Sequence, residues 1–197
     1  MKLILASANA GKLRELTALL KPLGHEVMRQ AAFNIESPPE TGATFFENAL
    51  IKARHAALHA KLPALADDSG IEVDALGGRP GVYSARYAGE NASDRENLEK
   101  MLLELQGVPD ARRTARYQCV IVLVRGVDDA RPLVASGSWE GRILTVPRGT
   151  RGFGYDPIFL PGGLERTAAE LEPAEKNALS HRAQALRALV AQLKCPG

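Results

Sequence analysis

The most informative stretch of the chain reads Leu62-Pro63-Ala64-Leu65-Ala66-Asp67-Asp68-Ser69-Gly70-Ile71. The short apolar run that ends at Ala66 predicts a buried strand, and the pair Ser69-Gly70 is typical of a turn. In open α/β sheets, ligands bind just beyond the carboxyl ends of the strands. Asp67 and Asp68 are therefore predicted to lie where a binding site forms. A plain surface turn is the alternative interpretation.

Adjacent carboxylates have a chemical consequence. Each raises the pKa of the other unless a cation or hydrogen-bond donors compensate. The pair therefore indicates either a Mg²⁺ site or a group that carries protons.

The composition is that of an ordinary globular protein, with 45% apolar and 24% charged residues in a chain of 197. This length predicts one domain, or one domain with an added lobe. The net charge of +2 is too small to indicate a nucleic-acid surface. No stretch resembles a signal peptide or a membrane span, and Cys119 and Cys195 are too few for a disulfide framework or a metal cluster. We expect a cytoplasmic protein with reduced thiols and small-molecule partners.

The N-terminal segment predicts a strand over Lys2–Ala6, a loop of small residues, and a helix marked by leucines from Leu13 to Leu23. The loop reads Ser7-Ala8-Asn9-Ala10-Gly11-Lys12. Such a junction presents unpaired N–H groups at the positive end of a helix, so it can hold a phosphate group. It is not a Walker A loop, because Ala6 and Leu13 replace the first Gly and the final Ser/Thr. A plain strand-to-helix turn is the alternative.

A second strand is expected over residues 25–31, followed by a loop over residues 35–42. Thr44 and Glu47 then form a capping box that begins a helix running to about Ala60. The predicted buried face of this helix consists of Phe46, Ala49, Leu50, Ala53 and Ala57. Another side carries Asn48, Lys52, His55 and His59, so Lys52 can point toward a ligand. A solvated face is the alternative for these four residues, and we favour it for the two histidines.

The middle of the chain predicts more strands and one more helix. The strand resumes at Ile71 and Val73, and residues 76–87 form a long glycine-rich loop. Ser93 and Glu96 form a second capping box, at the start of a helix that ends before residues 107–109. The runs 115–124 and 133–139 predict antiparallel strands of the same mixed sheet.

Two further segments carry candidate ligand-binding residues. In the loop 149–157, glycines permit close backbone approach, Phe153 and Tyr155 offer flat faces, and Asp156 offers an acceptor. Core aromatics in a tight turn are the alternative for Phe153 and Tyr155. Ser180 is the expected N-cap of a last helix, whose buried stripe holds Leu186, Leu189, Val190 and Leu193.

His181 and Arg182 stand in the first turn of that last helix, where the helix dipole disfavours a cation. This placement indicates that a ligand sets their identity. A pair of solvated side chains is the alternative.

Six motifs, in order along nearly the whole chain, resemble the inosine/xanthosine triphosphate pyrophosphatase family. They are Ser7 to Lys12, Thr44 to Ala53, Ala66 to Gly70, Pro80 to Arg86, Gly152 to Pro157, and Glu175 to Arg182. The resemblance implies an elongated mixed α/β sheet with flanking helices, forming one domain over 1–197 with two lobes around a central active-site cleft. It also implies a homodimer, and Mg²⁺-dependent hydrolysis of the deaminated purine nucleotides ITP, dITP and XTP to the monophosphate and pyrophosphate.

The same resemblance implies the site residues. Ser7, Ala8, Asn9, Ala10, Gly11 and Lys12 would hold the triphosphate, Lys52 would add positive charge, and Ser69 would contact the substrate. Asp68 would be the catalytic residue and a metal ligand. The base would be bound by Phe153, Gly154, Tyr155, Asp156, Lys176, His181 and Arg182.

Two positions depart from the family pattern. Ala8 stands where many members have Gly or Asn, which would alter the loop without removing its N–H donors. Glu40 follows Pro39 and lacks an acidic neighbour, so Glu40 as the second metal ligand has Glu36 and Glu47 as alternatives.

Two other functions fit parts of the sequence. One is a house-cleaning pyrophosphatase, an enzyme that removes modified nucleotides, with a preference for pyrimidines. The motifs at 153–156 and 180–182 disfavour this function. The other is a nucleotide-sensing module, which would need no Asp67-Asp68 pair.

Overall fold

The computed structural model describes residues 2–24 and 26–194. Within these ranges, six strands form one sheet in the order β2-β1-β3-β4-β5-β6. Their bounds are β1 Lys2–Ala6, β2 Glu26–Arg29, β3 Ala64–Val73, β4 Thr114–Val124, β5 Leu133–Ile143 and β6 Phe159–Pro161. β1 pairs in parallel with β2 and β3, whereas β5 and β6 are antiparallel. The predicted mixed α/β sheet is therefore confirmed, as is the placing of β4 beside β5.

In the part of the chain that the structure describes, five α-helices flank the sheet: α1 Ala10–Leu20, α2 Phe45–Ala60, α3 Asp94–Glu104, α4 Pro173–Leu179 and α5 His181–Lys194. Both predicted capping boxes are present, at Thr44 with Glu47 and at Ser93 with Glu96. In each, the hydroxyl accepts from the N3 amide while the glutamate accepts from the N-cap amide, which fixes where the helix begins. Within the described residues, no helix has the length and apolar character that crossing a membrane requires.

The chain divides into two compact units. The first contains the chain up to residue 68, residues 119–137 and the chain from residue 182; the second contains 69–118 and 138–181. β3, β4 and β5 each contribute residues to both units.

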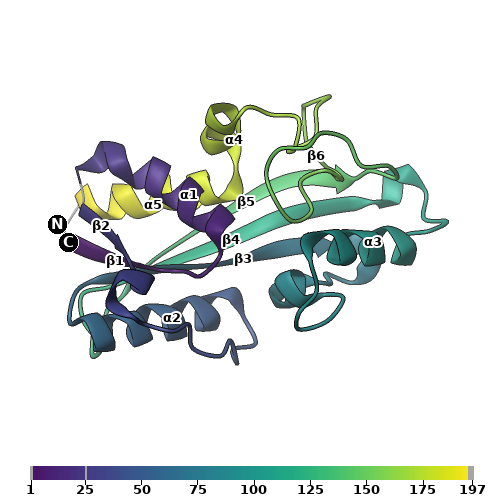
Figure 1. Ribbon diagram of the computed structural model, residues 1–197. Helices are drawn as coiled ribbons and strands as arrows, with labels where there is room; N and C mark the ends of the chain where they lie inside the picture. Colours follow the sequence, from purple (N-terminus) through teal and green to yellow (C-terminus); the bar gives the residue numbers. More distant parts are fainter. Residues whose placement is uncertain (1, 25, 195–197) are drawn as a thin grey trace. The chain divides into compact units, whose positions relative to one another are not determined.

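In the first unit, two apolar clusters lie on opposite faces of the strands. Leu3 and Leu5 of β1 pack with Leu16 of α1 and Leu186 of α5, while Ile4 packs with the alanines of α2. This follows from the period-2 alternation of a strand. Figure 1 shows the result: α1 and α5 lie side by side, and α2 lies on the opposite side of β1.

The second unit has its own core. Ile71 and Val73 of β3 pack there with Met101 of α3 and with an aromatic group of Tyr117, Trp139 and Phe159. This core anchors the loop over residues 152–157, because Tyr155 and Ile158 belong to it.

The predicted turn at Ser69-Gly70 is wrong. β3 runs without interruption from Ala64 to Val73, so the two aspartates lie inside a strand and not beyond its end. Both are buried, at 1% and 4% exposure, because cationic side chains from elsewhere in the chain compensate their charge. The surface-turn interpretation is excluded for the same reason.

Other local predictions also need correction. Residues 173–179 form the short helix α4, where only a segment leading into the last helix was expected. Phe46 is 39% exposed and Leu193 is 36% exposed, so neither belongs to a buried face. On α2 the buried polar residues are Asn48 and Lys52, at 0% and 8% exposure. His25, part of the expected second strand, and Cys195 lie outside the described residues.

The pairing of β5 with β6 generates a stability prediction. Gly141 faces Pro161 in this ladder, and a Cβ at Gly141 would lie 2.4 Å from the carbonyl oxygen of Leu160 and 2.7 Å from the Phe159 ring. Gly141→Ala should therefore lower the free energy of unfolding by about 1–3 kcal/mol through overpacking. Gly162→Ala is the matched control, because its nearest contact would be an ordinary 3.5 Å. Denaturant titration measures both, and equal effects of the two substitutions would contradict the prediction.

Candidate active site

The loop between β1 and α1 is built to expose backbone donors. Asn9 is the N-cap of α1, where its side-chain oxygen accepts from the Lys12 amide at 3.0 Å. The Asn9 amide in turn donates to the Ser7 hydroxyl at 3.3 Å. Ala8, Asn9 and Ala10 are exposed while Gly11 is buried against the unit. The loop therefore presents the N-terminus of an 11-residue helix to solvent, as phosphate binding requires.

Asp67 is a buried carboxylate surrounded by cations. Its Oδ2 lies 3.2 Å from Nζ of Lys12 and 3.5 Å from Nε of Arg182. Burial opposes ionisation of Asp67, but the charges of Lys12, Arg182 and Lys52 outweigh it and hold its pKa below the usual range. Asp67 is therefore ionised throughout the physiological pH range and is unsuited to accepting a proton.

Asp68 has the opposite character. Its Oδ1 lies 3.3 Å from Nζ of Lys52 and 3.9 Å from Nζ of Lys12, and its Oδ2 accepts from Nδ2 of Asn48 at 3.3 Å. Burial raises the pKa of Asp68 despite the two lysines, and Glu40 and Asp67 raise it further. Neighbouring carboxyl groups whose pKa values are pushed apart are the pattern expected of an acid or base beside a fixed charge.

Lys52 connects Asp68 to Glu40. Its Nζ lies 2.7 Å from Oε1 of Glu40. Burial lowers the pKa of Lys52, but Asp68, Asp67 and Glu40 together reverse the effect and raise it. Of the alternatives to Glu40, Glu47 accepts from the Ala43 and Thr44 amides at the start of α2, and Glu36 is exposed.

Arg182 lies in the first unit, where it donates to Glu15 of α1 as well as to Asp67. At 1% exposure it is among the most buried side chains. From the sequence we expected a ligand to pair with Arg182. In the structure the carboxylates of Glu15 and Asp67 pair with it instead. The solvated-pair interpretation is excluded by the burial of Arg182 and of His181, which is 3% exposed.

The second unit holds the other candidate residues around a second buried carboxylate. Asp156 accepts at Oδ2 from Nζ of Lys176 at 2.5 Å and from the Phe153 amide at 2.9 Å. Nζ of Lys176 also lies 4.9 Å from the centroid of the Phe153 ring, within cation–π range. Gly152, with φ +78, is needed because a Cβ there would lie 2.0 Å from Asp156. Asp156 thus organises this loop from within.

The aromatic residues of the loop differ in exposure. Phe153 is half-buried, so part of its ring is accessible. Tyr155 is buried and its hydroxyl donates to the Ser84 carbonyl oxygen at 2.7 Å, which agrees with the core interpretation. The Gly154 amide donates to Asp94 at 2.8 Å, and Ser69 is half-buried in β3.

Three residues that contact the candidate site residues were not among the predicted site residues. Asn48 holds Asp68 and also accepts from the Gly42 amide at 2.8 Å, and its spacing of four from Lys52 on α2 was the available signal. Glu15 lies three residues after Lys12, on the same side of α1. Tyr117 gave no signal, because a tyrosine in a strand is ordinary core composition.

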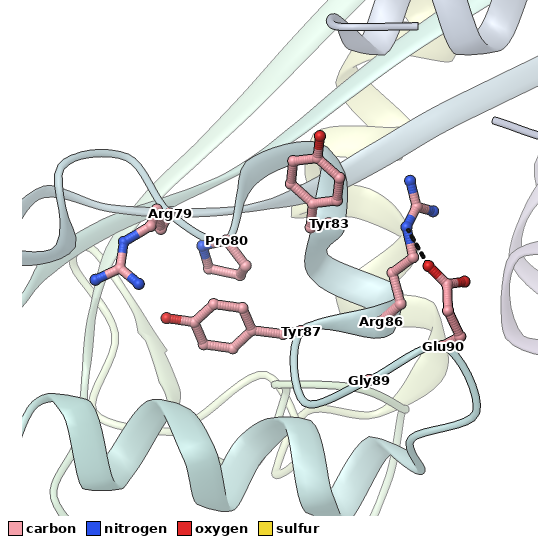
Figure 2. Close-up of a pocket in the computed structure, with 7 residues that line it drawn as sticks. All are labelled: Arg79, Pro80, Tyr83, Arg86, Tyr87, Gly89 and Glu90. Carbon is pink, nitrogen blue, oxygen red and sulfur yellow. Dashed lines mark ion pairs between the residues drawn. The ribbon is translucent and has the colours of Figure 1, made fainter. Parts of the chain in front are cut away.

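A surface pocket of about 360 Å³ lies in the second unit (Figure 2). Its lining residues are Arg79, Pro80, Tyr83, Arg86, Tyr87, Gly89 and Glu90. Arg79 pairs with Glu104 at 3.1 Å and Arg86 with Glu90 at 3.7 Å.

The chain has many relatives among known proteins, both in sequence and in fold. A solved structure of a HAM1 protein from Coxiella burnetii is 50% identical, with a TM-score of 0.90 over 98% of each chain. The dITP/XTP pyrophosphatases of Vibrio parahaemolyticus serotype O3:K6 and Methylococcus capsulatus are 59% and 57% identical, each over 98% of this chain and 96% of the relative. The sequence pattern of the Ham1 family matches residues 3–192. The chain belongs to the Ham1 family.

The burial of Arg182 generates the second prediction. Arg182→Met should lower the free energy of unfolding by about 3–5 kcal/mol, because it leaves Asp67 buried with one cation fewer. Arg14→Met, at an exposed arginine of α1, is the matched control and should change stability by about 0.5 kcal/mol at most. Denaturant titration of the protein without nucleotide measures both; a small loss for Arg182→Met would show that the ion pairs are dispensable.

Proposed function

We propose that this protein hydrolyses deaminated purine nucleoside triphosphates (ITP, dITP and XTP) to the monophosphate and pyrophosphate, and so cleanses the nucleotide pool. The names of the relatives, at 54–59% identity, support this activity. One observation carries the proposal. Asp67 and Asp68 have pKa values shifted in opposite directions, and they form ion pairs with Lys12 and Lys52 beside a loop that exposes the N-terminus of a helix.

In this proposal the first unit binds the polyphosphate. The loop from Ser7 to Lys12 holds phosphate oxygens at the N-terminus of α1, where residues 8–10 are exposed. Lys12 and Lys52 supply the full charges needed to stabilise the negative charge that develops on pyrophosphate as it leaves. Both lysines are already positioned by carboxylates, so little side-chain freedom is lost when the substrate binds.

Asp68 acts as the general base. It orients a water molecule and accepts its proton as the water oxygen bonds to the α-phosphorus. The bond from the α-phosphorus to the bridging oxygen breaks, and that oxygen leaves with pyrophosphate. Burial and the neighbouring carboxylates, which raise the pKa of Asp68, make it the better proton acceptor of the pair.

The residues present suit Mg²⁺. Oxygens of Glu40 and Asp68 both face Nζ of Lys52, at 2.7 and 3.3 Å, so the two carboxylates converge on a single cation position. Among the described residues no group of three or more His, Cys, Asp or Glu side chains could hold a metal. Mg²⁺ typically takes one or two carboxylates and completes its shell with water and substrate phosphates. When bound, Mg²⁺ would neutralise charge on the phosphates.

The second unit recognises the base. Phe153, Gly154, Tyr155, Asp156, Lys176 and His181 are the proposed residues. Hypoxanthine and xanthine carry an oxygen at position 6, whereas adenine carries an amino group there. A donor such as His181 would pair with the oxygen and face the adenine amino group unsatisfied, which costs about 1–3 kcal/mol per buried group. Guanine shares this oxygen, so its exclusion requires contacts at position 2.

The resemblance in sequence also supports two broader proposals. The protein acts in the cytoplasm, where the nucleotide pool lies, and it works as a homodimer.

The sole cysteine in the described residues, Cys119, is free, and burial raises its pKa to about 12, so it is an inert thiol.

A nucleotide panel tests the function. Pyrophosphate release should be fastest with ITP, dITP and XTP and slower by at least about 100-fold with ATP, since a site built to bond a substrate group rejects its absence strongly. EDTA should abolish release and excess Mg²⁺ should restore it. A preference for modified pyrimidine nucleotides would indicate the other house-cleaning activity. Tight binding without release would indicate a sensing module.

Asp68→Asn tests the base. The variant should lose at least about 10³-fold in kcat, as expected when a general base is removed, and should still bind ITP measurably by calorimetry. Asp74→Asn, an exposed aspartate that pairs with Arg116 at 2.9 Å, is the control and should keep wild-type turnover. Near-normal turnover by Asp68→Asn would remove this residue from the mechanism.

A further inference from the structure

Tyr117 on β4 contacts two of the proposed base-binding residues. Its ring stacks on the His181 ring, with centroids 4.7 Å apart and planes inclined by 8°. Its hydroxyl donates to Oδ1 of Asp156 at 3.3 Å. At 8% exposure Tyr117 lies behind these residues and is not itself a surface for a ligand.

We propose that Tyr117 is a positioning residue for purine recognition, acting through His181 and, more weakly, through Asp156. This inference rests on the proposed function, because it takes His181 to be a donor to the base. It adds a residue that selects the substrate without touching it.

The stacked ring fixes the orientation of His181. An imidazole directs its N–H groups in its own plane, so a parallel ring at stacking distance holds the plane in which those donors lie. Tyr117 is itself held from another side by Phe159, at 4.7 Å and 66°, and Phe159 by Trp139, at 5.5 Å and 61°. The backing is therefore a rigid aromatic group, as precise placement of a site residue requires.

The hydroxyl makes the weaker contribution. At 3.3 Å its bond to Asp156 exceeds the usual 2.5–3.0 Å for an O–H donor. The other oxygen of Asp156 already accepts from Lys176 and from the Phe153 amide. The carboxylate thus keeps its two strongest partners when the hydroxyl is removed, and we expect the aromatic ring of Tyr117 to carry most of the effect.

Two substitutions separate the ring from the hydroxyl. Tyr117→Phe keeps the stack and should leave the KM for ITP within about threefold of wild type, because only a long hydrogen bond is lost. Tyr117→Leu removes the stack and should raise the KM for ITP by about tenfold or more and narrow the preference for ITP over ATP. In both variants kcat at saturating ITP should stay within about threefold, because the reacting phosphates bind elsewhere.

Controls distinguish positioning from general loss of structure. Inorganic tripolyphosphate, used as a competitive inhibitor, should keep its inhibition constant in both variants, because it lacks a base. Tyr87→Phe removes a shorter tyrosine hydrogen bond in the same unit, 2.6 Å to Glu104, and should change neither KM nor selectivity.

Three outcomes would overturn the assignment. An unchanged KM and selectivity in Tyr117→Leu would show that the ring does not position His181. Weaker tripolyphosphate inhibition with a parallel fall in kcat would show a purely structural role. A wild-type protein that releases no pyrophosphate from ITP, dITP or XTP would overturn the proposed function first, and this assignment with it.

Discussion

The first unit depends on one buried charge, the carboxylate of Asp67. A buried carboxylate is destabilising unless cations compensate it, and here Lys12 of α1 and Arg182 of α5 both do so. Satisfying this one group therefore brings both helices against β3. The same arrangement places Lys12 at the start of α1, beside the β1–α1 loop, and keeps Asp67 ionised, which leaves the neighbouring Asp68 as the titratable member of the pair.

The second unit is also organised around a buried carboxylate, but the partners of that carboxylate differ. Asp156 is also buried, and it is satisfied by Lys176, by the Phe153 amide and by the Tyr117 hydroxyl. In the first unit the buried aspartate holds cations near the exposed loop; in the second it shapes a loop and places a cation over an aromatic ring. Two aspartates that a sequence pattern offers as ligand-binding groups thus act largely by organising the residues around them.

Local signals in the sequence predicted the elements well, and long-range contacts account for the errors. The capping box at Thr44 is complete within four residues, so its hydrogen bonds can be read directly from the sequence. The short helix α4 also carried a local signal, Pro173 at its first position with Glu175 accepting from the Glu172 amide. By contrast, the strand through Asp67 and Asp68 depends on Arg182, which is 115 residues from Asp67 in the sequence. The predicted site residues come from the family resemblance and stay a prediction, whereas the contacts of Tyr117 appear only in the folded chain.

In the proposed function, charge balance in the first unit gives a physical reason for a divalent cation to accompany the substrate. The ion pairs described above join four carboxylates, Glu15, Glu40, Asp67 and Asp68, to three cations, Lys12, Lys52 and Arg182. With all of them ionised, the charges of these seven groups sum to −1. A nucleoside triphosphate brings about four more negative charges and competes with the carboxylates for the same two lysines. Whatever charge the lysines give to the phosphates is withdrawn from Glu40 and Asp68, so those two carboxylates need a replacement cation. Mg²⁺ shared between them and the phosphates would meet both needs at once.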